Sequence, residues 1–179
     1  MRFTQTPLRG AWLIELDPIA DERGHFARTF DREAWEARGM DPAVVQCSAS
    51  FSEREGTLRG VHLQAQPHGE PKLMRVSRGA IFDVLVDLRE GSPTHRDWFG
   101  IELSVDNGRM LFAPRGFAHG FQTLTDRSEV IYQIGAPYVP DAATGVRWDD
   151  PELGIEWPPP PSGGRTISPR DLAWPLLKP

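Results

Sequence analysis

The feature that most constrains the fold is a series of short segments in which apolar and polar residues alternate, separated by glycine and proline. The clearest is Phe99–Val105, where every second residue is apolar; Ala80–Leu88 alternates in the same way, with Asp83 and Asp87 opposite its apolar residues. Alternation of this kind is typical of a β-strand that lies between a core and a polar surface. Three further segments are predicted to be strands: Lys72–Ser77, Arg109–Ala113 and Glu129–Ile134. Since 17 glycines and 17 prolines supply turns, the pattern predicts an all-β sandwich or barrel.

Helices are predicted at only two places. Residues 31–39, DREAWEARG, begin with a capping aspartate and end with a glycine suited to the left-handed conformation that stops a helix. Ser168–Asp171 has a capping serine, a proline at the first helical position and an acid three residues after the cap. Residues 158–164, PPPPSGG, cannot join a sheet and are predicted to form a connector.

Length and composition predict one domain, residues 1–179, of a cytoplasmic protein. No apolar run approaches the roughly 18 residues that a membrane helix needs, and the first residues lack the apolar stretch and cleavage site of a secretory signal. Cys47 is the only cysteine, which excludes an internal disulfide and a cysteine-based zinc cluster. A net charge of −5 argues against nucleic acid as a partner.

Two histidines lie in segments that resemble the metal-binding motifs of the cupin superfamily, a group of β-jelly-roll barrels. Gly56–His62, GTLRGVH, resembles the start of the first motif, and Gly108–His119 has the glycine, proline, glycine and histidine spacing of the second. Gln64 replaces the next metal-binding histidine, and no glutamate follows three or four residues later. Because a transition-metal site normally has three or four protein ligands, we expect no bound metal. A metal site in which His68 and Glu70 supply the missing ligands stays open.

Seven blocks of the chain together resemble the dTDP-4-dehydrorhamnose 3,5-epimerase family. In the family's order they are DERGHF (21–26), GTLRGVHLQ (56–64), PKLMRVSRGAIFDVLVDLREGSPT (71–94), PRGFAHGFQTL (114–124), the pair Tyr132 and Tyr138, RWDDPELGIEWP (147–158) and ISPRD (167–171). The resemblance implies a cupin-type β-jelly-roll barrel with a short N-terminal arm and minor helices. It also implies a cofactor-free enzyme that epimerises nucleotide-linked 4-keto-6-deoxy sugars.

The residue types at the matched positions suit this reaction. A C4 ketone acidifies the hydrogens on C3 and C5, so inversion needs a base on one face, an acid on the other and a group that stabilises the enolate. By resemblance His62 is the base, Asp171 orients it, and Tyr132 is the acid. Lys72, helped by His119, stabilises the enolate. Each has a structural alternative: a helix-start acid for Asp171, a cross-strand aromatic for Tyr132, and an ion-paired group for Lys72 or His119.

A second set of residues matches positions that hold the nucleotide diphosphate. Arg59 is expected to bind the diphosphate or the sugar, while Tyr138, Phe26 and Arg23 are expected to hold the nucleotide, partly across a dimer interface. The other pocket positions of this set are Gln46, Arg28 and Glu70. Six arginines cluster in the first half of the chain, and the alternative to ligand binding is that they form a solvated surface: Arg23, Arg28, Arg54, Arg59, Arg75 and Arg78.

Four positions depart from the usual family residues, namely Arg28, Ser48, Leu63 and Glu70. Arg28 replaces a glutamate, Ser48 an asparagine, Leu63 an aromatic and Glu70 a glutamine. Because these four positions contact the nucleotide or line the pocket and none belongs to the proton-transfer set, the sequence defines the type of reaction better than it defines the nucleotide of the substrate. Thymidine is the first choice, with cytidine and guanosine open.

The resemblance also implies a homodimer that exchanges an N-terminal strand, and Ala11–Leu16, AWLIEL, is expected to be an exposed arm that pairs along an edge. Residues 158–179 are expected to close the pocket. Two other functions stay open at this stage. One is a metal-dependent cupin oxygenase or isomerase, and the other is a barrel that binds a nucleotide sugar without turnover.

Overall fold

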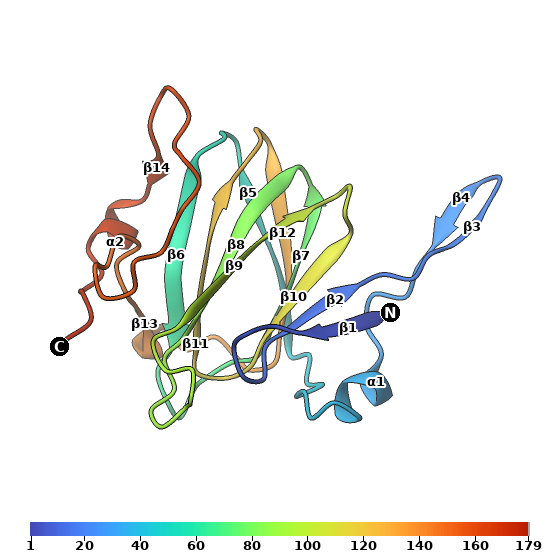
Figure 1. Ribbon diagram of the computed structural model, residues 1–179, viewed down its shortest axis with the longest axis horizontal. Helices are drawn as coiled ribbons and strands as arrows, with labels where there is room; N and C mark the ends of the chain where they lie inside the picture. Colours follow the sequence, from blue (N-terminus) through green and yellow to red (C-terminus); the bar gives the residue numbers. More distant parts are fainter. Residues whose placement is uncertain (179) are drawn as a thin grey trace.

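The computed structural model describes residues 1–178, in which two antiparallel sheets pack face to face (Figure 1). The first sheet has the strand order β1 (Arg2–Gln5), β2 (Trp12–Glu15), β10 (Arg109–Ala113), β7 (Lys72–Arg78), β12 (Ser128–Ile134) and β5 (Gln46–Ser52). The second has the order β13 (Ala143–Gly145), β6 (Thr57–Gln64), β11 (Phe117–Thr123), β8 (Ala80–Asp87) and β9 (Trp98–Ser104), and β14 (Thr166–Ile167) pairs with β6. The prediction of an all-β fold is confirmed.

The core between the sheets is built from the alternate residues that the sequence pattern singles out. Met74 and Val130 of the first sheet pack against Leu85 and Phe121 of the second, and all four are buried. The five segments predicted as strands are strands, with ends displaced by at most one residue. Apolar burial on this scale is the main driving force for assembling the two sheets.

The strand β8 differs from a half-exposed strand because both of its faces are covered. Asp83 and Asp87 are fully buried, although acids in an alternating pattern normally face water. On the opposite face, Val84 and Val86 pack against residues of the C-terminal segment, including Trp157. The chain after residue 145 therefore forms an outer layer over the second sheet.

The N-terminal arm is more integrated than the sequence predicted. AWLIEL is not an exposed edge, because β2 lies between β1 and β10 and both Ala11 and Ile14 are fully buried. Ile14 belongs to an apolar cluster with Trp35 of α1 (Arg32–Glu36). The predicted helix is confirmed, with Asp31 accepting a hydrogen bond from the Ala34 N–H at 3.2 Å.

A hairpin of β3 (Ile19–Asp21) and β4 (Gly24–Phe26) projects away from the two sheets, on the side opposite α2 and β14 (Figure 1). Its apolar residues Ile19 and Phe26 are 74% and 72% exposed. A two-stranded hairpin with exposed apolar side chains is marginally stable by itself.

The C-terminal segment is attached to the second sheet by several backbone contacts. After the 3-10 turn η1 (Pro140–Ala142) and β13, the chain returns to β6 through β14, and α2 (Pro169–Leu172) is its last helix within residues 1–178. Ser168 caps α2 as predicted, accepting a hydrogen bond from the Asp171 N–H at 3.1 Å. Beyond α2, the Leu177 N–H donates to Asp150 Oδ2 at 2.6 Å. No helix within residues 1–178 is both long enough and apolar enough to cross a membrane.

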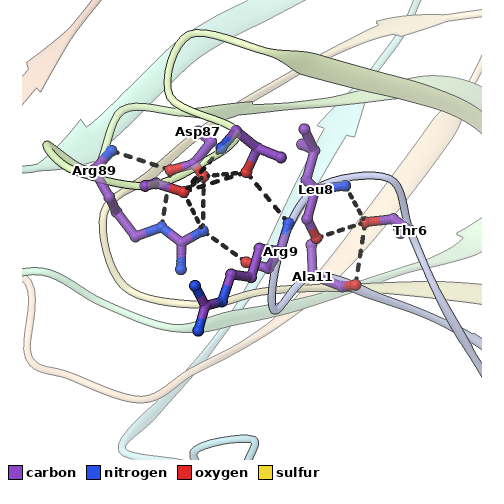
Figure 2. Close-up of polar contacts among 8 residues, drawn as sticks. Thr6, Leu8, Arg9, Ala11, Asp87 and Arg89 are labelled. Atoms are coloured by element: carbon purple, nitrogen blue, oxygen red, sulfur yellow. Dashed lines mark hydrogen bonds and ion pairs between the residues drawn. The ribbon is translucent and has the colours of Figure 1, made fainter.

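At the end of β8, a partly buried hydrogen-bond network around Asp87 joins the 87–97 loop to the N-terminal turn (Figure 2). The Asp87 carboxylate accepts hydrogen bonds from the Arg89 guanidinium at 2.7 and 2.8 Å, from Ser92 at 2.6 Å and from Thr94 at 2.7 Å. Arg89 also donates to the Arg9 carbonyl at 2.6 Å. Burial raises the pKa of Asp87, but these hydrogen bonds outweigh it and lower the pKa to about 2. Asp87 is therefore a structural anion, outside the cavity described below.

Candidate active site

A cavity of about 620 Å³ opens between the two sheets, a size typical of small-molecule sites. Its walls come from β5, β7 and β12 of one sheet and from β6, β11 and β13 of the other, and α2 closes one side. Nine of the residues predicted from the sequence line it: Gln46, Arg59, His62, Glu70, Lys72, His119, Tyr132, Tyr138 and Asp171.

Arg59 and His62 both line the cavity although they are three residues apart on one strand. Regular alternation would place them on opposite faces, but the pairing of β6 with β11 shifts register between the His119 and Phe121 pairs. Gly60 lies in this irregular stretch with φ +132°, and a Cβ there would stand 2.4 Å from the Gly120 Cα. Glycine therefore allows the close approach that turns both side chains inward.

His62 and Asp171 form a hydrogen-bonded pair on the cavity wall. His62 Nε2 lies 2.7 Å from Asp171 Oδ1, and Asp171 Oδ2 accepts from the Gly60 N–H at 3.3 Å. The His62 side chain is 39% exposed and that of Asp171 is 7% exposed. The imidazole is therefore accessible from the cavity, whereas the carboxylate is buried in the cavity wall. Burial raises the pKa of Asp171, but the hydrogen bond and charge of His62, with smaller effects of Gly60 and Trp174, outweigh it and lower the pKa. Asp171 is thus a carboxylate at neutral pH.

A second histidine–aspartate pair lies deeper in the same sheet. His119 Nε2 is 2.6 Å from Asp83 Oδ1, with the side chains 6% and 0% exposed. In residues 1–178, Asp83 Oδ2 is buried without a hydrogen-bond partner. The Asp83 carboxylate therefore lies beneath the cavity floor, where its charge contributes to raising the pKa of Tyr132.

Tyr132 faces the two histidines from the other sheet. Its ring packs edge-to-face on His119, with 5.9 Å between ring centroids. Burial raises the pKa of Tyr132, the Asp83 charge raises it further, and Arg59 opposes this only in part. The phenol therefore keeps its proton at neutral pH and is available as a donor.

Lys72 is ion-paired within the cavity. Its Nζ lies 2.6 Å from Glu70 Oε1, with the side chains 14% and 9% exposed. Glu70 Oε2 in turn accepts from Gln64 Nε2 at 3.2 Å, and Gln64 Oε1 accepts from the Val139 N–H at 2.6 Å. Gln64, which replaces a metal-binding histidine of other cupins, therefore links Lys72 to the loop that carries Tyr138.

Two arginines give the mouth of the cavity a positive charge. Arg59 is held by Ser52 Oγ at 3.2 Å and by the Phe51 carbonyl at 3.0 Å, and Arg170 of α2 lines the same cavity. At the other end of β5, the Tyr138 N–H donates to Gln46 Oε1 at 2.8 Å. A cavity lined by two guanidinium groups and an exposed aromatic ring suits a ligand with phosphates and a planar base.

Comparison with known proteins assigns this arrangement to a family. The dTDP-4-dehydrorhamnose 3,5-epimerase family profile matches residues 5–179. A curated protein of this name from Methanothermobacter thermautotrophicus is 44% identical over 178 residues, which is 99% of this chain and 95% of the relative. The chain belongs to the dTDP-4-dehydrorhamnose 3,5-epimerase family.

Solved structures agree with this assignment. The Bacillus anthracis dTDP-4-dehydrorhamnose 3,5-epimerase, which has TDP and PPi bound, superposes with a TM-score of 0.93 at 40% identity, covering 98% of this chain and 99% of that one. The Legionella pneumophila dTDP-6-deoxy-D-glucose-3,5-epimerase, in complex with dTDP-4-keto-L-rhamnose, has a TM-score of 0.90 at 36% identity, covering 98% and 92%. The predicted family and the cupin-type barrel are confirmed.

Three residues predicted for the family's nucleotide site lie outside this chain's own cavity. Arg23 is on the projecting hairpin, where it pairs with Asp21 at 2.5 Å, and Phe26 is exposed on the same hairpin. Arg28 pairs with Asp31, the cap of α1. The departure at Arg28 is therefore accommodated locally, whereas Ser48, Leu63 and Glu70 line the cavity.

Sequence reasoning missed three residues of this epimerase-family site: Asp83, Arg170 and Trp174. Asp83 was detectable in principle, since an acid on the same face as Ile81 and Leu85 of a buried strand needs a partner. Arg170 and Trp174 flank Asp171 in the sequence, but only the return of the chain to β6 through β14 reveals that they reach the cavity.

The alternative of a metal-dependent cupin has no ligand set to support it in the described structure. Within residues 1–178, no group of three or more His, Cys, Asp and Glu side chains is arranged to hold a metal ion. The two cupin-motif histidines are each engaged by an aspartate instead, and Glu70 is engaged by Lys72.

Proposed function

We propose that this protein inverts C3 and C5 of a dTDP-linked 4-keto-6-deoxy sugar, with His62 as the base and Tyr132 as the acid. The observation that carries the proposal is the placement of the two groups. The His62–Asp171 pair on β6 and α2 and the protonated phenol on β12 line one cavity from different sheets. A sugar held between them presents one face to each group.

The first step is removal of the carbon-bound proton. Because His62 Nε2 is bonded to Asp171, Nδ1 is the nitrogen that accepts the proton from C3 or C5. The C–H electron pair moves into the adjacent bond, and the ketone oxygen becomes an enolate. The Asp171 carboxylate stabilises the imidazolium that results.

The second step is return of a proton to the opposite face. The Tyr132 hydroxyl donates its proton to the carbon, the enolate collapses to the ketone, and the phenolate is reprotonated from solvent. His62 loses its proton to solvent, and the same two steps act on the second carbon. Lys72 and the His119 ring, which lie in the same cavity, stabilise the enolate oxygen between the two steps.

The substrate class follows from the mouth of the cavity and from the relatives. Arg59 and Arg170 suit a diphosphate, and Tyr138, which is half exposed, offers a surface for a base. Thymidine is favoured because TDP and a dTDP-linked keto sugar are bound in the B. anthracis and L. pneumophila structures. Ser48, Leu63 and Glu70 are the positions at which this chain would set its own preference.

Incubation with 4-keto-6-deoxyglucose linked to dTDP, CDP or GDP in deuterated water tests the function. NMR should show deuterium at both C3 and C5 and inverted product, fastest with the dTDP sugar. Exchange at one carbon alone would make the protein a mono-epimerase. Binding of all three without exchange would replace the proposal with a non-catalytic nucleotide-sugar-binding protein.

The projecting hairpin supports a homodimer in which each hairpin reaches the partner's cavity. Phe26 and Arg23 are predicted nucleotide contacts, yet they lie outside their own chain's cavity, and the edge strand β5 at the cavity exposes Phe51. We expect light scattering to give twice the 20.1 kDa chain mass, and Phe26→Ala to raise the KM for the nucleotide sugar. A monomer with full activity would contradict this.

We also retain one domain, residues 1–179, with 158–179 as its closing tail. Asp171 and Trp174 of this tail line the cavity, which supports the closing role. The cytoplasmic location expected from the sequence stays a prediction.

A further inference from the structure

Trp174, two residues after α2, lines the cavity beside the proposed base. Its indole packs against the His62 imidazole with 5.8 Å between ring centroids and an interplanar angle of 62°. Edge-to-face aromatic pairs of this kind have a preferred geometry in addition to their contact area. The reaction described above gives the indole no role.

The position of the indole is fixed from more than one side. On β13, Gly145 is the residue paired with His62, and a Cβ added there would stand 3.0 Å from Trp174 Cδ2 and 3.1 Å from Cε2. The Arg170 guanidinium lies 5.4 Å from the centroid of the ring. The ring therefore fits a space that the absence of a side chain at Gly145 leaves open.

The indole N–H is buried and faces the acidic member of the pair. Trp174 Nε1 has no hydrogen bond of ordinary geometry within residues 1–178, but its N–H lies close enough to the Asp171 carboxylate to help lower the pKa of Asp171. The ring is thus held beside both members of the His62–Asp171 pair.

His62 needs such support because its side chain is 39% exposed and, among the described residues 1–178, only one of its ring nitrogens is bonded, to Asp171. Proton removal from carbon requires Nδ1 to point at the C–H bond, and misplacement of a reacting group by about 1 Å can cost about 100-fold in rate. Resting on the function proposed above, we propose that Trp174 is a positioning residue that fixes the plane of the His62 imidazole.

The test compares Trp174→Ala, which removes the ring, with Trp174→Phe, which keeps an aromatic edge beside His62. Trp12→Phe, on β2 and outside the cavity lining, is the control for loss of a tryptophan. We expect Trp174→Ala to lower kcat by about 10- to 100-fold with little change in KM, and Trp174→Phe to restore most of the loss. A rise in KM without loss of kcat would make Trp174 a substrate wall, and full activity of Trp174→Ala would remove any role; either result overturns the proposal.

NMR of the substrate-free protein tests the positioning role of Trp174 separately from the proposed epimerase activity. In the free protein, the His62 ring signals, assigned by their absence in His62→Ala, should carry a ring-current shift that Trp174→Ala abolishes and Trp174→Phe keeps in part. Unchanged His62 signals in Trp174→Ala would overturn the positioning role even in an active enzyme. Wild-type protein that shows the shift but turns over no keto sugar would instead refute the proposed function.

Discussion

His62→Ala is expected to lower turnover of the keto sugar by about 10²- to 10⁴-fold, because no other cavity side chain is placed to replace the base. His119 lies in the same cavity, but it is bonded to Asp83 and almost fully buried. Deuterium exchange at C3 and C5, followed by NMR, measures the loss directly. Exchange should fall as steeply as product formation, since both begin with removal of the proton.

The matched control is His95→Ala, which removes an exposed histidine outside the cavity lining and should leave turnover unchanged. A double-mutant cycle with Asp171→Asn then tests the pair. If Asp171 acts only through His62, the double variant should be no slower than His62→Ala alone. Exchange that survives His62→Ala at the wild-type rate would assign the base to another residue.

The residues proposed to transfer protons include His62 and Asp171, and each of these two lies in a distinctive local block of the sequence. His62 follows the GTLRGV stretch and Asp171 ends ISPRD, and the structure joins them at 2.7 Å across 109 residues. What the sequence pattern could not supply is the register shift at Gly60 that turns Arg59 inward as well. A period-two pattern assigns residues three apart to opposite faces unless a bulge intervenes.

The fold class followed from alternation, but the covering of each sheet did not. In the sequence AWLIEL looks like an exposed arm and Ala80–Leu88 like a half-exposed strand, but other elements cover both: β1, β10 and α1 in the first case, and the chain after residue 145 in the second. Such layers depend on contacts between residues far apart in the chain, which local periodicity does not encode. For the same reason, the sequence did not reveal that Arg170 and Trp174 line the cavity.

Tyr132→Phe is expected to separate the two halves of the reaction. The change removes the hydroxyl that we propose returns a proton, keeps the ring that packs on His119, and leaves the His62–Asp171 pair intact. Net epimerisation should fall by about 10²- to 10⁴-fold, while hydrogen exchange through His62 should fall far less. The raised pKa of Tyr132, caused by burial and by the Asp83 charge, further implies that loss of the phenolic proton does not limit wild-type turnover below about pH 10.

The ratio of exchange to inversion is therefore the decisive quantity for Tyr132. With the phenol absent, a deuteron can return only from the His62 face, so the recovered substrate should be labelled but not inverted. A thermal unfolding midpoint close to that of the wild type would show that the barrel is intact. Equal loss of exchange and inversion in Tyr132→Phe would mean that the phenol takes part in forming the enolate, and the acid of the opposite face would then have to be sought among the other residues of the cavity.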